Sequence, residues 1–291
     1  MTARIIDGRK VAQGVRAGLA ERVRRLRERG VRPGLAVVLV GDNAASQVYV
    51  RQKTKACEEV GVHSHVHKLA GSASEDRILE VIHSLNADPA IHGLIVQLPL
   101  PRHVDMAKVL EAIDVEKDVD GFHLYNVGSL VIGSSHIVFP PCTPYGVQLL
   151  LEHEGIEIEG RNVVVVGASN IVGKPMALML LRKEATVSIC HVKTRDLAQF
   201  TILADILIVA AGKPNLITAP MVKTGAAVID VGINRLPDGR LVGDVDFDAV
   251  REKASHITPV PGGVGPMTVT MLIWNTVEAA ERHASGRISP R

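Results

Sequence analysis

NVVVVGASNIVGKPM, residues 162–176, joins an apolar run to a segment with two glycines and a proline. The run of four valines at 163–166 predicts a strand buried on both faces, and a turn at Gly167 leads into a helix with Pro175 near its start. Glycines let the backbone approach a pyrophosphate, and a helix N-terminus offers N–H donors. The spacing is not G-x-G-x-x-G: the turn has Gly167 and Gly173, and Ser169 stands where the second glycine would be. The turn alone is therefore a weak signal of dinucleotide binding.

Short apolar runs of the same kind recur along the chain. Those after the turn are TVSIC (186–190), DILIVAAG (205–212) and AAVIDVG (226–232), and those before it are LAVVLV (35–40) and GLIVQLPLP (93–101). Helical patterns lie between them, such as 46–60, which Gly61 closes. Strands that alternate with helices predict an α/β fold with parallel sheets. The ordered strand–helix units after Gly167 strengthen the dinucleotide interpretation.

A cluster of three prolines and a glycine in PPCTPYG, residues 140–146, predicts a domain boundary. We expect a first domain over 1–142 and a Rossmann-like dinucleotide-binding domain over 143–266, with a cleft between them. The second domain is expected to open with a helix at Tyr145. A final helix over about 267–285 follows the loop PVPGGVGPMT and is expected to pack back on the first domain.

The residues after the second cofactor strand bear on the choice of cofactor. NAD-preferring enzymes usually carry an acidic residue near this point for the ribose hydroxyls. Here the strand ends at Cys190 and His191, Lys193 and Arg195 follow, which suit a 2′-phosphate. An exposed basic turn would explain them too, but the pattern favours NADP.

Composition limits the classes of function. The chain has 291 residues, is 46% apolar and 22% charged, and carries a net charge of +2 with only 3% aromatic residues. A dedicated nucleic-acid binder usually has a stronger basic patch interleaved with aromatic residues, so no nucleic-acid partner is expected. The basic run at 21–30 is interpreted as the solvated side of an amphipathic helix that ends at Gly30.

Cysteine and histidine usage argues for a reducing compartment and no metal site. Three cysteines form no CxxC pair, no apolar signal segment opens the chain, and the longest apolar runs are about six residues. We therefore expect a soluble cytoplasmic protein with no membrane contact. His63, His65 and His67 alternate as metal ligands on a strand can, but a polar edge strand explains them equally well.

Several polar residues of the first half are candidates for chemistry. Tyr49 and Lys53 are four residues apart, which places them on one helix face, where either a solvated pair or a catalytic pair can lie. Gln97 ends a buried strand, the end at which open α/β sheets bind ligands. Asp120 lies in the polar loop EKDVDGF, which ordinary turn chemistry would also explain. The cofactor turn comes more than a hundred residues later, unlike in short-chain dehydrogenases with Tyr-x-x-x-Lys.

Taken together, these segments resemble the bifunctional methylenetetrahydrofolate dehydrogenase/cyclohydrolase family. The matching stretches are RPGLAVVLVGDNAASQVYVRQK, GLIVQLPLP, EKDVDGFH, PCTP, GASNIVGKPM, VIDVGINR, GDVDF and TPVPGGVGPMT. The resemblance covers about residues 5–275 and implies a homodimer with folate in a cleft between two domains. It implies NADP-dependent oxidation of 5,10-methylenetetrahydrofolate and hydrolysis of the methenyl product to 10-formyltetrahydrofolate. Purine, histidine and methionine biosynthesis draw on that one-carbon metabolism.

The resemblance also implies roles for single residues. Lys53 resembles the catalytic lysine, Tyr49 the tyrosine that packs on the folate, Gln97 the glutamine that positions lysine and substrate, and Asp120 the aspartate that holds the pterin. Further candidates for folate contact are Leu98, Pro99, Pro261, Gly262 and Gly263. The candidates for NADP contact are Gly167, Ala168, Ser169, Ile171, Val172, His191, Lys193, Arg195 and Ile233.

Two positions depart from some members of the family. Ala168 stands where some carry an arginine for the 2′-phosphate, and Val192 where some carry a serine or an arginine. This weakens the preference for NADP without reversing it, since Lys193 and Arg195 can substitute. Two rival functions remain at this point, another NADP-linked dehydrogenase of a small substrate and a non-enzymatic folate-binding module.

Overall fold

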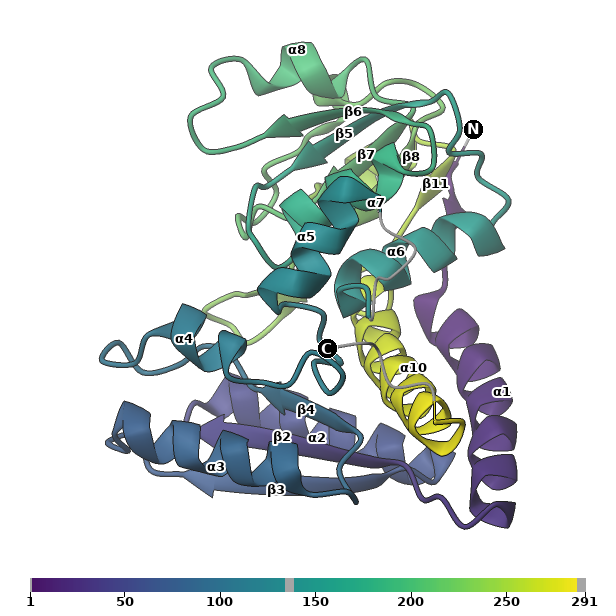
Figure 1. Ribbon diagram of the computed structural model, residues 1–291. Coiled ribbons are helices and arrows are strands. Elements are labelled where there is room, and N and C mark those ends of the chain that lie inside the picture. Colours follow the sequence, from purple (N-terminus) through teal and green to yellow (C-terminus); the bar gives the residue numbers. More distant parts are fainter. Residues whose placement is uncertain (1, 134–138, 287–291) are drawn as a thin grey trace. The chain divides into compact units, whose positions relative to one another are not determined.

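The computed structural model describes residues 2–133 and 139–286. The chain forms two units that each hold a parallel sheet (Figure 1). The six-stranded unit combines the N-terminal stretch as far as Gln13 with Thr143–Thr268, and the three-stranded unit combines Gly14–Cys142 with the stretch from Val269. The predicted α/β class with parallel sheets is confirmed.

The six-stranded sheet has the strand order β1-β11-β8-β7-β5-β6, and all its pairings are parallel. Its strands are β1 (Arg4–Ile5), β5 (Asn162–Val166), β6 (Thr186–Cys190), β7 (Ile206–Val209), β8 (Ala227–Asp230) and β11 (His256–Ile257). The unit also holds α6 (Cys142–His153), α7 (Gly173–Leu181), α8 (Leu197–Thr201), the 3₁₀ helix η1 (Ala219–Met221), α9 (Phe247–Arg251) and the hairpin β9 (Asn234–Arg235) and β10 (Leu241–Val242). Central β7 and β8 are buried at every position, as their apolar runs predict.

The three-stranded sheet has the order β3-β2-β4, again parallel throughout. Its strands are β2 (Gly34–Val40), β3 (His63–Leu69) and β4 (Gly93–Val96), and its helices are α2 (Ala44–Val60), α3 (Glu75–Ala87), α4 (Met106–Glu111) and α5 (Leu124–Ile132). Central β2 is buried at all seven positions. Edge strand β3 carries the three alternate histidines, and the rings of His63 and His65 meet edge to face at 4.1 Å.

Two boundaries differ from the prediction, and proline chemistry explains both. β4 ends at Val96, well before residue 101, because Pro99 and Pro101 have no N–H to donate to a neighbouring strand. α6 begins at Cys142 and not at Tyr145. A proline is tolerated in the first turn of a helix, where its missing N–H has no partner anyway, so the helix can start ahead of Pro144.

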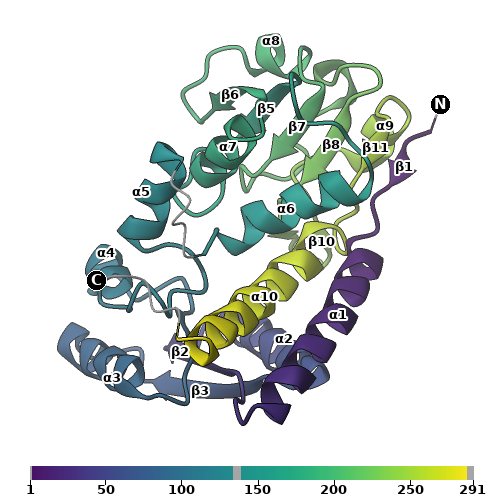
Figure 2. The ribbon, with the colours of Figure 1, turned by 45° about the vertical axis from the view of Figure 1, so that its right-hand side comes forward.

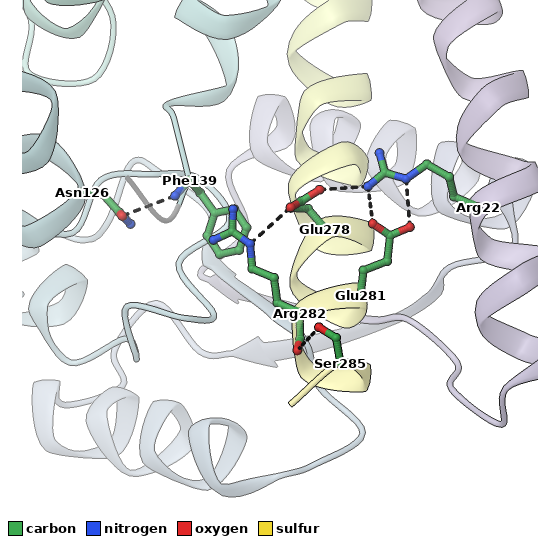
Figure 3. A network of polar contacts seen from close by, with 7 residues as sticks. All are labelled: Arg22, Asn126, Phe139, Glu278, Glu281, Arg282 and Ser285. Atoms are coloured by element: carbon green, nitrogen blue, oxygen red, sulfur yellow. Dashed lines mark hydrogen bonds and ion pairs between the residues drawn. The ribbon is translucent and has the colours of Figure 1, made fainter. Parts of the chain in front are cut away.

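Helices α1 (Gly8–Glu28) and α10 (Val264–Ala284) lie side by side in both ribbon views (Figures 1 and 2). Arg22 of α1 joins them, because its guanidinium donates to Glu281 Oε2 at 2.6 Å and to Glu278 Oε2 at 2.9 Å (Figure 3). The same guanidinium lies 4.9 Å from the centre of the Trp274 ring. Arg282 extends the network, donating to Glu278 at 3.2 Å and lying over the Phe139 ring. The predicted amphipathic helix is therefore present, and part of its basic side binds α10.

No helix among the described residues is long and apolar enough to cross a membrane. Within residues 2–133 and 139–286, no group of three or more histidine, cysteine or acidic side chains is arranged to hold a metal ion.

Candidate functional site

Lys53 lies on the buried face of α2. That face presents Val50, Lys53, Cys57 and Val60 to the interior at intervals of three and four residues, and only 9% of Lys53 is exposed. Asn43 begins the helix by accepting the N–H of Ser46. A solvated helix face therefore does not describe Lys53. Tyr49, one turn earlier, is half-buried.

Gln97 meets Lys53 at the carboxyl end of β4. The Lys53 ammonium donates to Gln97 Oε1 at 3.2 Å, and Gln97 Nε2 donates to the carbonyl of Leu98 at 2.9 Å. The second bond turns the amide so that its oxygen faces the lysine. Leu98 is half-buried, Pro99 is exposed, and the peptide bond between them is cis.

Asp120 and Cys142 complete a cluster with Lys53. Burial raises the pKa of the Asp120 carboxyl, while the Lys53 ammonium and a hydrogen bond from the Cys142 thiol act in the opposite direction. Burial and the Asp120 charge raise the pKa of Cys142 well above its usual value, and its thiol also donates to Val119 O at 3.2 Å. Of these residues, sequence reasoning missed only Cys142. Its place between prolines and a helix start was the available signal.

Asp118 holds the loop that carries Asp120. This buried carboxylate accepts the N–H of Gly121 at 3.2 Å, the N–H of His123 at 2.8 Å and the side-chain amide of Asn126 at 2.8 Å. Asn126 in turn accepts the N–H of Phe139 (Figure 3). Of the two aspartates of DVDG, Asp118 therefore fastens the backbone and Asp120 points to the lysine cluster.

Lys117 fastens the same loop from the other side. Its ammonium donates to three carbonyls at the end of α3, those of Leu85 at 3.1 Å, Asn86 at 2.7 Å and Asp88 at 2.8 Å. Unpaired carbonyls and the negative end of the helix dipole favour a cation at this position. Lys117 O also accepts the N–H of Leu94 in β4 at 2.7 Å, so the loop is tied to the sheet as well.

Replacement of Lys117 by methionine is expected to destabilise this unit. The three carbonyls lose their donor, which should lower the free energy of unfolding by about 1–3 kcal/mol, measured by urea unfolding. Lys68→Met, at an exposed position of β3, is the control and should change it little. Equal stability of both variants would show that water replaces the ammonium without cost.

The predicted cofactor turn brings backbone segments close together at its two glycines. Gly167 has φ +122°, and a Cβ there would overlap the carbonyl oxygen of Ala210. A Cβ on Gly173, at the start of α7, would overlap the carbonyl oxygen of Gly167. The Ser169 hydroxyl accepts the N–H of Val172 at 3.1 Å and that of Gly173 at 3.4 Å. Serine at the second glycine position therefore binds the backbone N–H groups of the N-cap residue and the first residue of α7.

The remaining candidate cofactor residues lie on the same edge of this sheet. Gly167 N donates to Cys190 O at 2.8 Å, which joins the turn to the end of β6. His191, Lys193 and Arg195 follow and are exposed. His191 Nδ1 accepts the N–H of Lys193 at 3.1 Å, so the histidine shapes the turn. Ala168, Ile171 and Val172 are half-buried, Ser169 is exposed, and Ile233 is 45% exposed.

Pro261, Gly262 and Gly263 form the loop between β11 and α10 and belong to the six-stranded unit. Gly262 has φ +114°, Gly263 N donates to Pro259 O at 2.9 Å, and the Val260–Pro261 peptide is cis. A Cβ on Gly8 would overlap Gly263 O, so the start of α1 packs on this loop. The candidate residues thus form two groups, Tyr49, Lys53, Gln97, Leu98, Pro99 and Asp120 in one unit and all the others in the other.

Comparison with known proteins extends over both units. The model of the tetrahydrofolate dehydrogenase/cyclohydrolase catalytic domain matches residues 6–120, and that of the NAD(P)-binding domain matches residues 141–284. Bifunctional protein FolD of Nitrosospira multiformis is 64% identical over 282 residues, 97% of each chain. The FolD methylenetetrahydrofolate dehydrogenase/cyclohydrolase of Campylobacter jejuni has a TM-score of 0.95 at 51% identity, covering 97% of this chain and 99% of that one. The Trypanosoma brucei enzyme, solved with NADP cofactor and inhibitor, has a TM-score of 0.94 at 41% identity, covering 99% and 100%.

Proposed function

This chain belongs to the tetrahydrofolate dehydrogenase/cyclohydrolase family, and from that membership we propose how its own residues serve the two reactions. The enzyme oxidises 5,10-methylenetetrahydrofolate to 5,10-methenyltetrahydrofolate with NADP and hydrolyses the product to 10-formyltetrahydrofolate. We assign folate binding to residues 1–142 and NADP binding to 143–266.

The oxidation needs orientation more than acid–base chemistry. The hydride leaves a carbon between two nitrogens, whose lone pairs stabilise the resulting cation, so no proton moves in this step. NADP, when bound, accepts the hydride. The glycine turn at Gly167 and the N-terminus of α7 suit its pyrophosphate, because glycine lets the backbone pack closely there and the helix start offers N–H donors. The protein supplies binding and alignment.

The hydrolysis needs a base, and Lys53 is placed to be one. Water must lose a proton as it attacks the methenyl carbon, and the nitrogen that leaves as the ring opens must gain one. We assign the first transfer to the Lys53 amine, and the return of that proton to the leaving nitrogen balances the reaction. The observation that supports this most directly is the partly buried Lys53–Gln97 contact at 3.2 Å beside Asp120. Gln97 orients the lysine, and Asp120 accepts hydrogen bonds from the pterin.

Tyr49 lies one helical turn from Lys53 and packs on the folate ring in this proposal. Leu98 and Pro99, which follow Gln97 directly, line the same site. The loop Pro261–Gly263 offers backbone groups to the remainder of the folate. We also propose a cytoplasmic homodimer, consistent with the family and with three unpaired cysteines. Light scattering of the purified protein tests the dimer.

A spectrophotometric assay tests the proposed function. Purified enzyme receives methylenetetrahydrofolate with NADP and, separately, with NAD, and the absorbance of reduced cofactor and of methenyltetrahydrofolate is followed at two wavelengths. Reduced NADP should appear without lasting accumulation of the methenyl compound, because the second activity consumes it. Cofactor reduction with an alcohol but not with the folate would contradict the assignment.

The preference for NADP is expected to depend on Lys193 and Arg195. Both are exposed in the turn after β6, where no acidic side chain intervenes, so their joint replacement by alanine should raise KM for NADP several-fold and leave KM for NAD unchanged. Alanine at Arg182 and Lys183, exposed residues that precede β6, removes the same charge and should not alter the ratio. Equal use of NADP and NAD by the unmodified enzyme would indicate that Ala168 and Val192 affect the choice of cofactor more than Lys193 and Arg195 do.

A further inference from the structure

Two buried aspartates lie at the carboxyl edge of the six-stranded sheet, outside the candidate residues described above. Asp230 ends β8 and is 3% exposed, and Asp244 follows β10 and is fully buried. Neither has a cationic partner in the hydrogen bonds and ion pairs of the described residues. Every acceptor contact of the pair is instead to backbone N–H groups or an amide, which is how an uncompensated buried carboxylate is stabilised.

Asp244 joins two loops at this edge. Its Oδ2 accepts the N–H of Ala211 at 2.6 Å and of Gly212 at 2.8 Å, in the loop after β7. Its Oδ1 accepts the side-chain amide of Asn234 at 2.8 Å, at the start of β9. The residue just ahead of Ala211, Ala210, is the one whose carbonyl leaves no room for a Cβ at Gly167. The Asp244 carboxylate therefore links the loop after β7, which lies next to the Gly167 turn, to Asn234.

Asp230, for its part, binds the backbone of Asp244 and Val245. Its Oδ1 accepts the N–H of Gly232 at 2.9 Å and of Asp244 at 3.0 Å, and its Oδ2 accepts the N–H of Val245 at 2.9 Å. The packing requires glycine at position 243, since a Cβ there would overlap the Asp230 carboxylate. Burial raises the pKa of Asp230 to about 6, against the opposing effect of its three N–H donors.

Ile233 lies between two residues that these hydrogen bonds hold in place. Its neighbours on both sides are fixed, Gly232 by Asp230 and Asn234 by Asp244, while Ile233 itself remains 45% exposed. The strand order β8-β7-β5-β6 places the basic turn after β6 on one side of Gly167 and both loops on the other. A dinucleotide with its 2′-phosphate at the basic turn and its pyrophosphate at Gly167 extends its nicotinamide half toward these loops.

We propose that Asp230 and Asp244 are positioning residues for the nicotinamide half of NADP, holding Ile233 and the backbone of Ala211 and Gly212 where the cofactor meets them. The inference rests on the proposed function, because it takes the cofactor to lie along this edge. It makes Asn234 the most informative position to change, since its amide is the donor in the link to Asp244.

Asn234→Asp and the exchange Asn234→Asp/Asp244→Asn test the proposal. The single change sets two carboxylates against each other and should raise the NADP Kd, measured by calorimetry without folate, by about tenfold or more. The exchange restores a donor and an acceptor with reversed roles and should recover most of that loss. Hydrolysis of added methenyltetrahydrofolate without NADP should stay within about twofold in both. Asp244→Asn alone, which keeps its volume and lets the Asn234 amide turn, should give a smaller rise.

Asp205→Asn is the matched control. Asp205 accepts the N–H of Asn162 at 2.9 Å and pairs with Lys223, at the amino edge of the same sheet. Its loss should lower stability and leave the NADP Kd unchanged. An unchanged Kd in Asn234→Asp, no recovery in the exchange, or parallel loss of both activities would each overturn the positioning role. An unmodified enzyme that does not oxidise methylenetetrahydrofolate with NADP would instead overturn the proposed function.

Discussion

Lys53→Met is expected to lower the hydrolysis of methenyltetrahydrofolate by about 10²–10⁴-fold, the usual contribution of general acid–base catalysis. Methionine keeps most of the side-chain volume in the buried stripe of α2, so the helix should keep its packing. Hydride transfer requires no base and should fall much less, through poorer orientation of the substrate. The variant should therefore release methenyltetrahydrofolate, which its absorbance reveals while reduced NADP is still being formed.

Lys55→Met is the matched control for this experiment. It lies two residues further along α2 on the exposed side and should leave both activities unchanged. Equal loss of both activities in Lys53→Met, with folate and cofactor still bound, would make the lysine a positioning group and not a base. Loss of neither would remove Lys53 from the mechanism despite its burial.

Asp120→Ala is expected to raise KM for the folate about tenfold or more and to leave NADP binding near that of the unmodified enzyme. A lost buried hydrogen bond to a charged group costs roughly 1.5–3 kcal/mol. The loop itself should keep its shape, because Asp118 and Lys117 fasten it independently of Asp120. KM is measured for each substrate at saturation of the other.

Asp76→Ala provides the comparison, since Asp76 is an exposed carboxylate in the first turn of α3. A folded Asp120→Ala enzyme with unchanged folate KM would show that the carboxylate does not contact the pterin. A fall in kcat for hydrolysis alone would indicate that Asp120 acts on Lys53, whose charge it faces, more than on the substrate.

Local patterns were sufficient to predict the strands β2, β4, β5, β6, β7 and β8, whereas the two-residue strands β1 and β11 were not predicted. The apolar run LAVVLV (35–40) by itself predicts a buried strand, and β2 (Gly34–Val40) includes the whole run. The glycines of the cofactor turn were readable too, because close backbone approach excludes other residues at Gly167 and Gly173. The structure describes the positions of the candidate site residues within each unit. Their roles stay predictions.

What the sequence did not reveal depends on contacts between distant segments. The two aspartates of DVDG look alike in the sequence, and only the donors around Asp118 distinguish it from Asp120. The link between Asp230 and Asp244 bridges fourteen residues, and no periodic pattern points to it. Such pairings follow from how loops pack at a sheet edge, which local propensity does not encode.

The interleaving of the two units along the chain constrains how the protein folds during synthesis. β1 is synthesised first and pairs with β11 at residues 256–257. Arg22, in the first fifth of the chain, pairs with Glu278 and Glu281, which are synthesised much later. The six-stranded unit can therefore complete its contacts only after Thr268 has been made, and the three-stranded unit only after the helix ending at Ala284 has emerged. Arg22 and its neighbours on α1 therefore remain without their partners on α10 for nearly the whole of translation.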